Sequence, residues 1–195
     1  MKRKLVGRKT PRTPDAATSW RGLGSVMRRI IPLAVVAGLL LAAAPVLAAG
    51  QSDLASARQA TAKFHQAKHA EAAGYESTID LLGCFENPEV GGMGLHYVDF
   101  GLFDDVIDAT KPEALVYEMR SNGQLKLVAL EYIVPLEAWS GDHPPMLFGQ
   151  HFHQHPVLPL FVLHAWIWSP NPLGMFEDWN PRVGMCPEGV PVFGE

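Results

Sequence analysis

The sequence predicts a protein of class α+β, in which an N-terminal helix packs on an antiparallel sheet of about four or more strands. One observation behind this prediction is a single Ala-rich segment with helical periodicity. Another is the series of apolar, alternating segments that follows it, separated by Gly and Pro. The 18 Gly and 16 Pro among 195 residues are too few for a low-complexity chain, so we expect a packed core.

The predicted helix covers residues 53–73. Ser52 in front of it is a favourable N-cap, and Gly74 behind it is a favourable C-terminal stop. Its apolar side chains fall on one stripe at intervals of three and four residues, but few of them are large. We therefore expect a helix that covers one face of a sheet.

Four segments have the composition of strands. The central two, 114–119 and 125–134, flank Ser121-Asn122-Gly123, and Asn-Gly between apolar runs is the strongest short signal for a hairpin. Residues 94–100 precede this pair and residues 160–168 follow it. Consecutive strands joined by a tight turn predict antiparallel pairing.

Positive charge is concentrated at the start of the chain. Nine of the 16 Lys and Arg residues precede position 30, with Asp15 as the one acid among them. A short apolar run, 30–44, follows, and then the small residues Val46 and Ala48. This order predicts a secretory signal peptide over residues 1–48 with an extended basic n-region, and a single globular exported domain over residues 49–195.

The apolar run is shorter than the roughly 20 residues that a membrane-spanning helix needs, and Pro45 follows it directly. We therefore expect no stable membrane anchor after cleavage, and a secreted or periplasmic protein. The sequence leaves open Sec or twin-arginine export, and a start of translation at Met1 or at Met27.

The predicted exported domain is acidic. It has 19 acids and seven bases, a net charge of −12, and it contains all eight His. Because phosphate groups need a dense basic surface, we expect no nucleic-acid partner. A surface of this charge attracts cations instead.

Both cysteines, Cys84 and Cys186, belong to the predicted exported domain, where an oxidising compartment favours a disulfide bond between them. Such a bond closes a loop of about 100 residues, which chain-entropy models credit with nearly 5 kcal/mol. The alternatives are a redox pair, disfavoured because the C-x-x-C spacing is missing, and a thiolate metal ligand.

Three polar residues stand in strand-like, apolar surroundings. A carboxylate at Glu131 needs a partner or a raised pKa, and in a region with few Lys and Arg a His or a metal ion is a credible partner. His96 follows a Gly-rich stretch at a predicted strand start, and His164 alternates with Trp166 and Trp168. The competing interpretations are an outward-facing Glu131 and a hydrogen-bonded core residue at His164.

Five of the remaining six His residues form two groups. In a strand, His151, His153 and His155 would share one face and could converge on Zn²⁺ or Cu²⁺, whereas Pro156 favours a solvated loop. His65 and His69 are four residues apart on the predicted helix, where we prefer a solvated face.

Several strings extend over nearly all of the predicted exported domain: ATAKFH (60–65), GMGLHY (92–97), KPE (111–113), LVYE (115–118), LVALEY (127–132) and LHAWIWSPNPLGMFEDWNP (163–181). They resemble the shared strings of a family of uncharacterised exported bacterial proteins. The resemblance implies export and a single domain, and it implies no mechanism. His96, Glu131 and His164 lie within these strings, whereas the triplet from His151 to His155 does not.

Our first functional hypothesis is a protein that binds a divalent transition metal, Zn²⁺ or Cu²⁺. Its expected ligands are His96, Glu131 and His164, with His153 as an added candidate. Two His and one carboxylate form an open site for a catalytic metal, so a metalloenzyme that activates water or oxygen is one form of this hypothesis.

Two hypotheses compete with metal binding. One is a module that binds a small apolar or aromatic ligand, with Trp166 and Trp168 in the pocket wall. The other is an envelope protein without catalytic activity. The Ser residues lack a G-x-S-x-G setting, so nothing in the sequence indicates a serine hydrolase.

Overall fold

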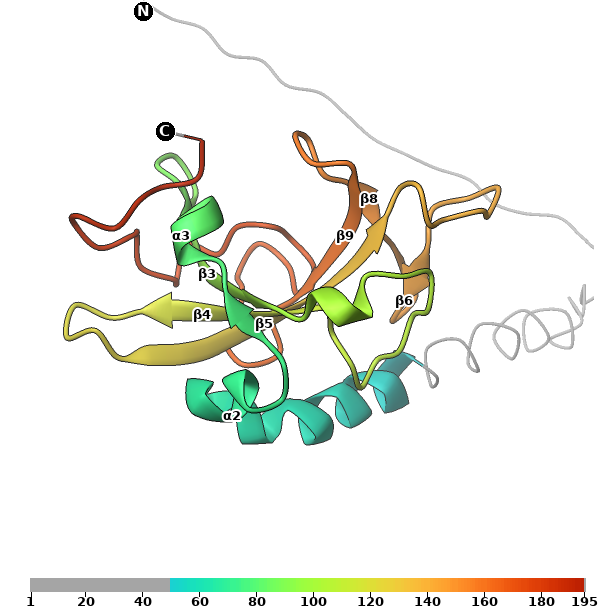
Figure 1. The fold of residues 1–195 in the computed structure, drawn as a ribbon, viewed down its shortest axis with the longest axis horizontal. Coiled ribbons are helices and arrows are strands. Elements are labelled where there is room, and N and C mark those ends of the chain that lie inside the picture. The colour runs from blue at the N-terminus through green and yellow to red at the C-terminus, as the bar shows by residue number, and fades with distance from the viewer. Residues whose placement is uncertain (1–49, 195) are drawn as a thin grey trace, which may run out of the picture.

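The computed structural model describes residues 50–194, in which the N-terminal helical segment, residues 50–71, lies on one side of an antiparallel sheet (Figure 1). The predicted α+β class is confirmed. The predicted leader, residues 1–48, lies outside the described residues. Within the described part of the chain, no helix is long and apolar enough to cross a membrane.

The helical segment is interrupted, in contrast to the predicted unbroken helix over 53–73. Residues 50–61 are helical, and a 3-10 turn η1 (Ala62–His65) and helix α2 (Ala67–Glu71) follow. The break lies at Gln66, which is extended (φ −106°, ψ 111°). The Tyr117 hydroxyl donates a 2.6 Å hydrogen bond to the carbonyl oxygen of Phe64, which a continuous helix would pair with the amide of residue 68.

The main sheet has seven strands in the order β1-β3-β4-β5-β9-β8, with β2 also paired to β3. All of its strand pairs are antiparallel. The strands are β1 (Glu76–Ser77), β2 (Phe85–Asn87), β3 (Gly91–Val98), β4 (Ala114–Met119), β5 (Leu125–Pro135), β8 (His153–Gln154) and β9 (Leu160–Ala165). A second, two-stranded sheet consists of β6 (Met146–Leu147) and β7 (Gln150–His151), and the short helical turns are α3 (Ile79–Leu82) and η2 (Phe100–Leu102).

The predicted hairpin is confirmed as the pair β4–β5. Its turn places Gly123 at φ 77°, a left-handed conformation that glycine adopts without strain. The amide of Arg120 donates to the carbonyl of Gln124 at 2.9 Å and closes the turn. Strand β9 ends at Ala165, three residues before the predicted end. The next amide, that of Trp166, donates to the carbonyl of Met175 instead of to a neighbouring strand.

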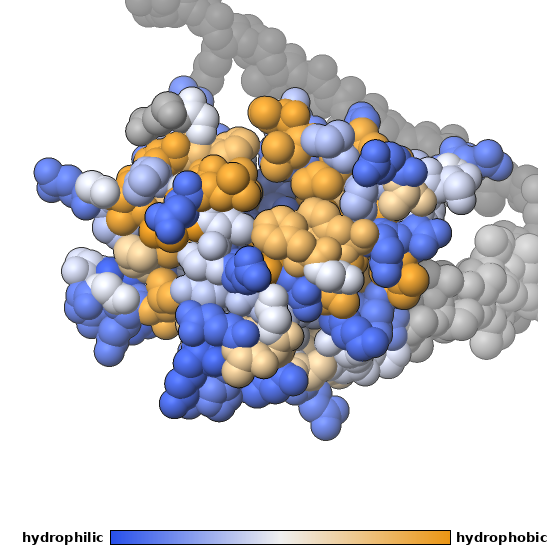
Figure 2. All heavy atoms as spheres, in the orientation of Figure 1, coloured by the Kyte–Doolittle hydropathy of each residue, from blue (hydrophilic) through white to orange (hydrophobic). Residues whose placement is uncertain are grey.

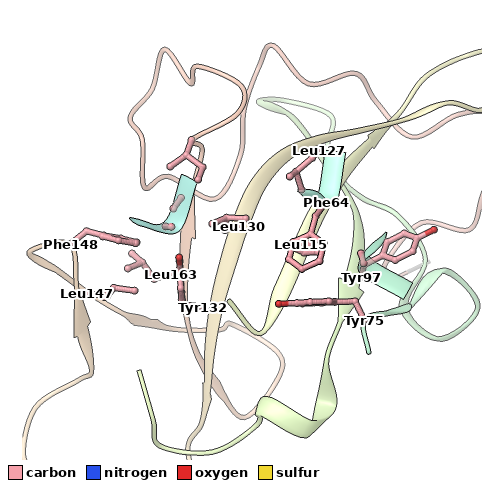
Figure 3. Close-up of a cluster of buried hydrophobic side chains, with 14 of the residues drawn as sticks. Phe64, Tyr75, Tyr97, Leu115, Leu127, Leu130, Tyr132, Leu147, Phe148 and Leu163 are labelled. Carbon is pink, nitrogen blue, oxygen red and sulfur yellow. The ribbon is translucent and has the colours of Figure 1, made fainter. Parts of the chain in front are cut away.

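The two faces of the sheet carry different side chains, because successive residues of a strand point to opposite sides. One face packs against the helical segment and forms the main apolar core, to which the buried residues Tyr97, Leu115, Tyr117, Leu130, Tyr132 and Leu163 belong, together with Phe64 and Tyr75 (Figure 3). The other face carries the neighbours of these residues in sequence, including the buried side chains of Val98, Ala114, Ile133 and Val162.

The C-terminal segment is attached to the region around β2. A disulfide bond joins Cys84 to Cys186, as predicted, so both cysteines of the chain are oxidised and neither is a thiolate ligand. The amide of Cys84 donates to Pro191 and its carbonyl accepts from Phe193, whose ring stacks on Phe85 with centroids 4.4 Å apart. The bond is typical of proteins that fold in an oxidising compartment.

One buried carboxyl group, that of Glu113, lies directly before β4. Its Oε2 atom accepts a 2.9 Å hydrogen bond from the amide of Ile133. Burial raises the pKa of Glu113 to about 8, against the lowering effect of this hydrogen bond. The charges of Asp104 and Glu131 raise it further. In the folded protein the group therefore stays protonated over a pH range in which it ionises in the unfolded chain.

We predict that Glu113→Gln removes a pH-dependent loss of stability. Because the folded protein holds this proton up to about pH 8, the free energy of unfolding of the wild type falls between about pH 4.5 and pH 8. The amide keeps an oxygen acceptor for Ile133 but does not titrate. The variant should match the wild type within about 1 kcal/mol at pH 5 and exceed it by at least about 1 kcal/mol at pH 9.

Urea unfolding at pH 5, 7 and 9 measures this difference. The matched control is Glu137→Gln, at an exposed position, which should leave the pH profile of the wild type unchanged. Parallel profiles for Glu113→Gln and the wild type would contradict the prediction.

Candidate metal centre

Three of the predicted ligand residues come from three strands and point to the same face of the sheet. His96 lies on β3, Glu131 on β5 and His164 on β9. Glu131 is directly opposite His164 in the β5–β9 pair and opposite Ala114 in the β4–β5 pair. The small side chain of Ala114 leaves room for the carboxylate of Glu131 to reach across β4 toward His96.

The side chains of His96, Glu131 and His164 converge. The distance from His96 Nε2 to Glu131 Oε2 is 3.3 Å, and that from His164 Nε2 to Glu131 Oε1 is 3.6 Å. All three residues are buried, and one ligand-type atom from each lies within 4.8 Å of the other two. This buried group, called the His-Glu-His group below, can hold a metal ion.

Two nitrogen atoms of the His-Glu-His group are buried without a hydrogen-bond partner among the described residues: His96 Nδ1 and His164 Nε2. Leaving a buried donor or acceptor unpaired costs about 1–3 kcal/mol. A closed network of hydrogen-bonded ion pairs would satisfy such atoms. His164 Nε2 faces the carboxylate of Glu131 at 3.6 Å without a hydrogen bond. This arrangement is more typical of residues that bind a metal ion together than of a closed hydrogen-bond network.

A fourth residue, Asp178, orients His164. Its Oδ1 atom lies 3.1 Å from His164 Nδ1, and its Oδ2 atom lies 3.2 Å from His153 Nε2. A carboxylate that accepts a hydrogen bond from Nδ1–H leaves the lone pair of the imidazole on Nε2, the tautomer that a metal ligand needs. His153, predicted as an added ligand, contacts Asp178 and lies outside the His-Glu-His group.

The charges of the group favour its ionised forms against the effect of burial. Burial alone would raise the pKa of Glu131, but the charges of His164 and His96 and the hydrogen bond from His96 hold it below its usual value. Burial alone would lower the pKa of His164, but Glu131 and Asp178 raise it. The pKa of Asp178 is lowered by its hydrogen bonds to His153 and His164, although burial opposes this.

A cavity of about 310 Å³ opens directly over the His-Glu-His group. His96, Glu131 and His164 form part of its wall, with Asp178 beside them. Most of the remaining wall is apolar and includes Phe85, Val98, Phe103, Ile133, Leu160 and Val162. Figure 2 shows a hollow in this face of the molecule, between α3 and β8 of Figure 1, with hydrophobic side chains around it.

The predicted triplet of His residues does not share one face. His151 is exposed at the end of β7, whereas His153 and His155 line the cavity. The buried Phe152 separates β7 from β8, and the two strands belong to different sheets. The Nδ1 atom of His155 accepts hydrogen bonds from the amides of Val157 and Leu158, and burial lowers the pKa of this ring.

The two tryptophans predicted for a binding pocket lie on opposite sides of the sheet. Trp166 is buried in the same apolar cluster as Phe85 and Met93, and its ring stacks on that of His164 with centroids 6.4 Å apart. Trp168 packs against the helical segment, 5.0 Å from the guanidinium of Arg58. The alternation ends with β9 at Ala165, so the two indoles do not share a face, and neither lines the cavity.

His65 and His69, on the helical segment, are exposed, in agreement with a solvated face. His65 contacts the ring of Trp168 edge-on at 4.3 Å.

Sequence reasoning missed Asp178, and it placed Trp166 and Trp168 in the wall of a ligand pocket in place of the residues that line the cavity. Asp178 stands in the irregular segment after β9, where no periodicity marks one acid among others. Its position inside the string LHAWIWSPNPLGMFEDWNP was the available signal. The cavity wall combines strands with α3, η2 and the C-terminal segment, and their contact follows from tertiary packing alone.

Comparison with known proteins assigns no family. No family model matches the chain, and no solved structure matches it significantly. The mouse deubiquitinase OTUD6B is 28% identical over 130 residues, which is 65% of this chain and 35% of that protein. The chain thus spans about a third of the length of this curated relative. The fold and site describe an α+β protein with a buried His-Glu-His group under an apolar cavity.

Proposed function

We propose that this chain is an exported metal-binding protein that holds one divalent transition metal, Zn²⁺ or Cu²⁺, through His96, Glu131 and His164. The observation that carries the proposal is the convergence of these three buried side chains from three different strands. Asp178 supports it, because it orients the imidazole of His164 in the way that second ligand shells do.

The spacing of the donor atoms fits this proposal. Zinc ligands of this kind lie about 2.0–2.1 Å from the ion, so the ligand atoms of a tetrahedral site are roughly 3.4 Å apart. Glu131 Oε2 lies 3.3 Å from His96 Nε2, and Glu131 Oε1 lies 3.6 Å from His164 Nε2. One ligand atom from each of the three residues lies within 4.8 Å of the other two, so small side-chain movements bring them to this spacing. Three protein ligands leave a further coordination position for water or substrate, on the side where the cavity lies.

The chemistry of such a site is that of a Lewis acid. Two His and one Glu are the ligands of hydrolytic zinc sites, in which the metal activates a bound water for attack on a substrate. We therefore favour a metalloenzyme, because this form of the proposal accounts for the cavity as well as for the three ligands. A metal-storing or non-catalytic envelope protein would need the ligands but not the cavity over them.

Export is part of the proposal. The leader over residues 1–48 is predicted from the sequence, and the Cys84–Cys186 disulfide supports an oxidising destination. The acidic balance of the predicted exported domain favours the approach of cations.

Metal binding is tested on protein recovered from cells that express the full chain without a polyhistidine tag. We expect about one equivalent of metal by elemental analysis. After chelation, titration with Zn²⁺ or Cu²⁺ should raise the midpoint of thermal unfolding, because binding at 100 times the dissociation constant stabilises a folded protein by about 2.7 kcal/mol. Substoichiometric metal together with no thermal response to either ion would refute the proposal.

The variants separate ligands from other residues. Glu131→Gln and His164→Gln should lose the bound metal, whereas His69→Ala, at an exposed position, should keep it. Asp178→Asn should retain the stoichiometry but bind about 10–100 times more weakly, because it removes an orienting carboxylate and no ligand. Near-UV circular dichroism verifies that each variant is folded.

A further inference from the structure

The proposed metal accounts for one wall of the cavity and leaves its other walls unexplained. We propose that the cavity binds a small, neutral, largely apolar organic molecule whose single oxygen donor points toward the His-Glu-His group. The contact between this donor and a metal rests on the proposed function. The apolar part of the binding does not depend on it.

The size of the cavity limits the molecule. Its volume is about 310 Å³, at the lower end of the range of roughly 300–1,000 Å³ found for ligand pockets. An apolar cavity of about 150 Å³ is enough for benzene. The cavity therefore matches a molecule of about two fused rings, or an aliphatic one of similar volume, and is too small for a peptide or a complete lipid.

The walls select an apolar molecule. The sheet contributes Val98, Ile133 and Val162, and also Phe85 from β2 beside the disulfide bond. The segment after η2 contributes Phe103. Burial of apolar surface against such walls is worth about 25 cal/mol per Å². Charged or hydrogen-bonding groups on a ligand would find no polar partner along these apolar walls.

The charged groups of the cavity exclude an anion. Among the described residues, neither Lys nor Arg lines it, whereas Glu131 and Asp178 do. A divalent ion in the His-Glu-His group would only balance these two carboxylates, so a carboxylate, sulfate or phosphate on the ligand would add uncompensated negative charge and would lose its hydration. A neutral oxygen donor incurs neither penalty.

The entrance is also apolar. Leu81 on α3, Phe100 on η2 and Val157 after β8 line the cavity and remain 73%, 49% and 72% exposed. Exposed apolar side chains that are contiguous with a pocket mark a surface for apolar ligands. Figure 2 shows this concentration of hydrophobic side chains around the hollow, in a molecule whose neighbouring surface is largely hydrophilic.

The polar end of the cavity has room for one donor atom. The Nδ1 atom of His155 is occupied by two backbone amides, so its ring proton resides on Nε2. His153 is paired with Asp178, and His96 with Glu131. A single ligand oxygen can thus meet the His-Glu-His group or the Nε2–H of His155, whereas a second polar group would face apolar walls.

The test uses three probes of equal ring size, titrated into metal-loaded wild-type protein and followed by calorimetry. They are 1-naphthol, with one neutral oxygen, naphthalene, with none, and 1-naphthalenesulfonate, which is anionic. We expect saturable binding of 1-naphthol and naphthalene, with the sulfonate at least ~10-fold weaker than either. Absence of saturable binding for the two neutral probes, or equal binding of the sulfonate, would overturn the proposal.

Two variants locate the binding and separate it from the metal. Leu160→Trp fills the cavity from a half-buried position and should weaken both neutral probes by at least ~10-fold while the metal content stays unchanged. The control Val106→Trp adds the same side chain at an exposed position outside the cavity and should change neither. Probe binding that survives Leu160→Trp unchanged would overturn the proposal even if the metal is present.

Glu131→Gln tests the direction of the oxygen donor. It should keep the affinity for naphthalene and lower that for 1-naphthol to the same level, because the metal contact is lost. If 1-naphthol binds equally well to this variant and to the metal-loaded wild type, the donor does not point at the His-Glu-His group and that part of the proposal falls. A protein that binds naphthalene but no metal would refute the proposed function and leave the apolar cavity as a binding site.

Discussion

Replacement of both Cys84 and Cys186 by Ser should lower the free energy of unfolding by about 4 kcal/mol. The bond spans 102 residues of sequence, and chain-entropy models give about 4.7 kcal/mol for a closed loop of 100 residues. The folded state should change little, because the Cys84 amide donates to the Pro191 carbonyl and the Phe193 amide donates to the Cys84 carbonyl, and these bonds also hold the C-terminal segment. Most of the loss therefore comes from the greater freedom of the unfolded chain.

Urea unfolding of the double variant and the wild type, at one pH and metal concentration, measures the difference. Wild-type protein reduced with a thiol during unfolding is the control, and its stability should approach that of the variant. A difference below about 1 kcal/mol would show that the bond closes a loop already restricted in the unfolded ensemble. Because Phe193 lines the cavity and stays held by its backbone hydrogen bond to Cys84, the affinity of the folded variant for apolar probes should stay close to that of the wild type.

Tyr117→Ala should cost about 3–5 kcal/mol in the free energy of unfolding, as expected for truncation of a large buried ring. Tyr117 is completely buried in β4, and its ring packs edge-on against Tyr97 with centroids 4.9 Å apart. Its hydroxyl also donates the 2.6 Å hydrogen bond to Phe64 that joins the sheet to the helical segment.

Tyr117→Phe is the matched variant that removes only the hydroxyl. It should cost about 1–3 kcal/mol, because the buried carbonyl of Phe64 loses its partner. Both variants should bind metal with wild-type stoichiometry under folded conditions, since Tyr117 lies on the sheet face away from the cavity. Equal losses for the two variants, or loss of metal from folded Tyr117→Phe, would contradict this interpretation.

The sheet was predictable because its signals are local. The alternation along the strands and the Asn-Gly turn at Gly123 depend on residues close in sequence, and they predicted the β4–β5 hairpin correctly. The break at Gln66 was not predictable, because it depends on a hydroxyl from Tyr117, 53 residues away from its acceptor. The position of Trp168 was not predictable for a similar reason. Strand β9 ends at Ala165, so the alternation that the sequence suggested does not extend to Trp168, which packs against the main core.

The candidate site was predictable in its inner part. His96, Glu131 and His164 are polar residues in apolar strands, and burial of such groups requires partners, which is a physical reason to expect them together. The sequence did not indicate Asp178 or the loop residues of the cavity wall. Irregular segments have no periodicity from which the direction of a side chain can be inferred. Residues on strands were thus inferred from composition, whereas residues on loops required the structure.

The two-sided sheet has a consequence for how the site is assembled. Glu131 stands opposite His164 in the same register that places Leu130 and Tyr132 in the core. A slip of one residue between these strands would turn the core side chains toward the cavity and the ligands toward the helical segment. Hydrophobic burial therefore disfavours any slip by an odd number of residues, so the packing of the core face helps to align the ligands on the other face.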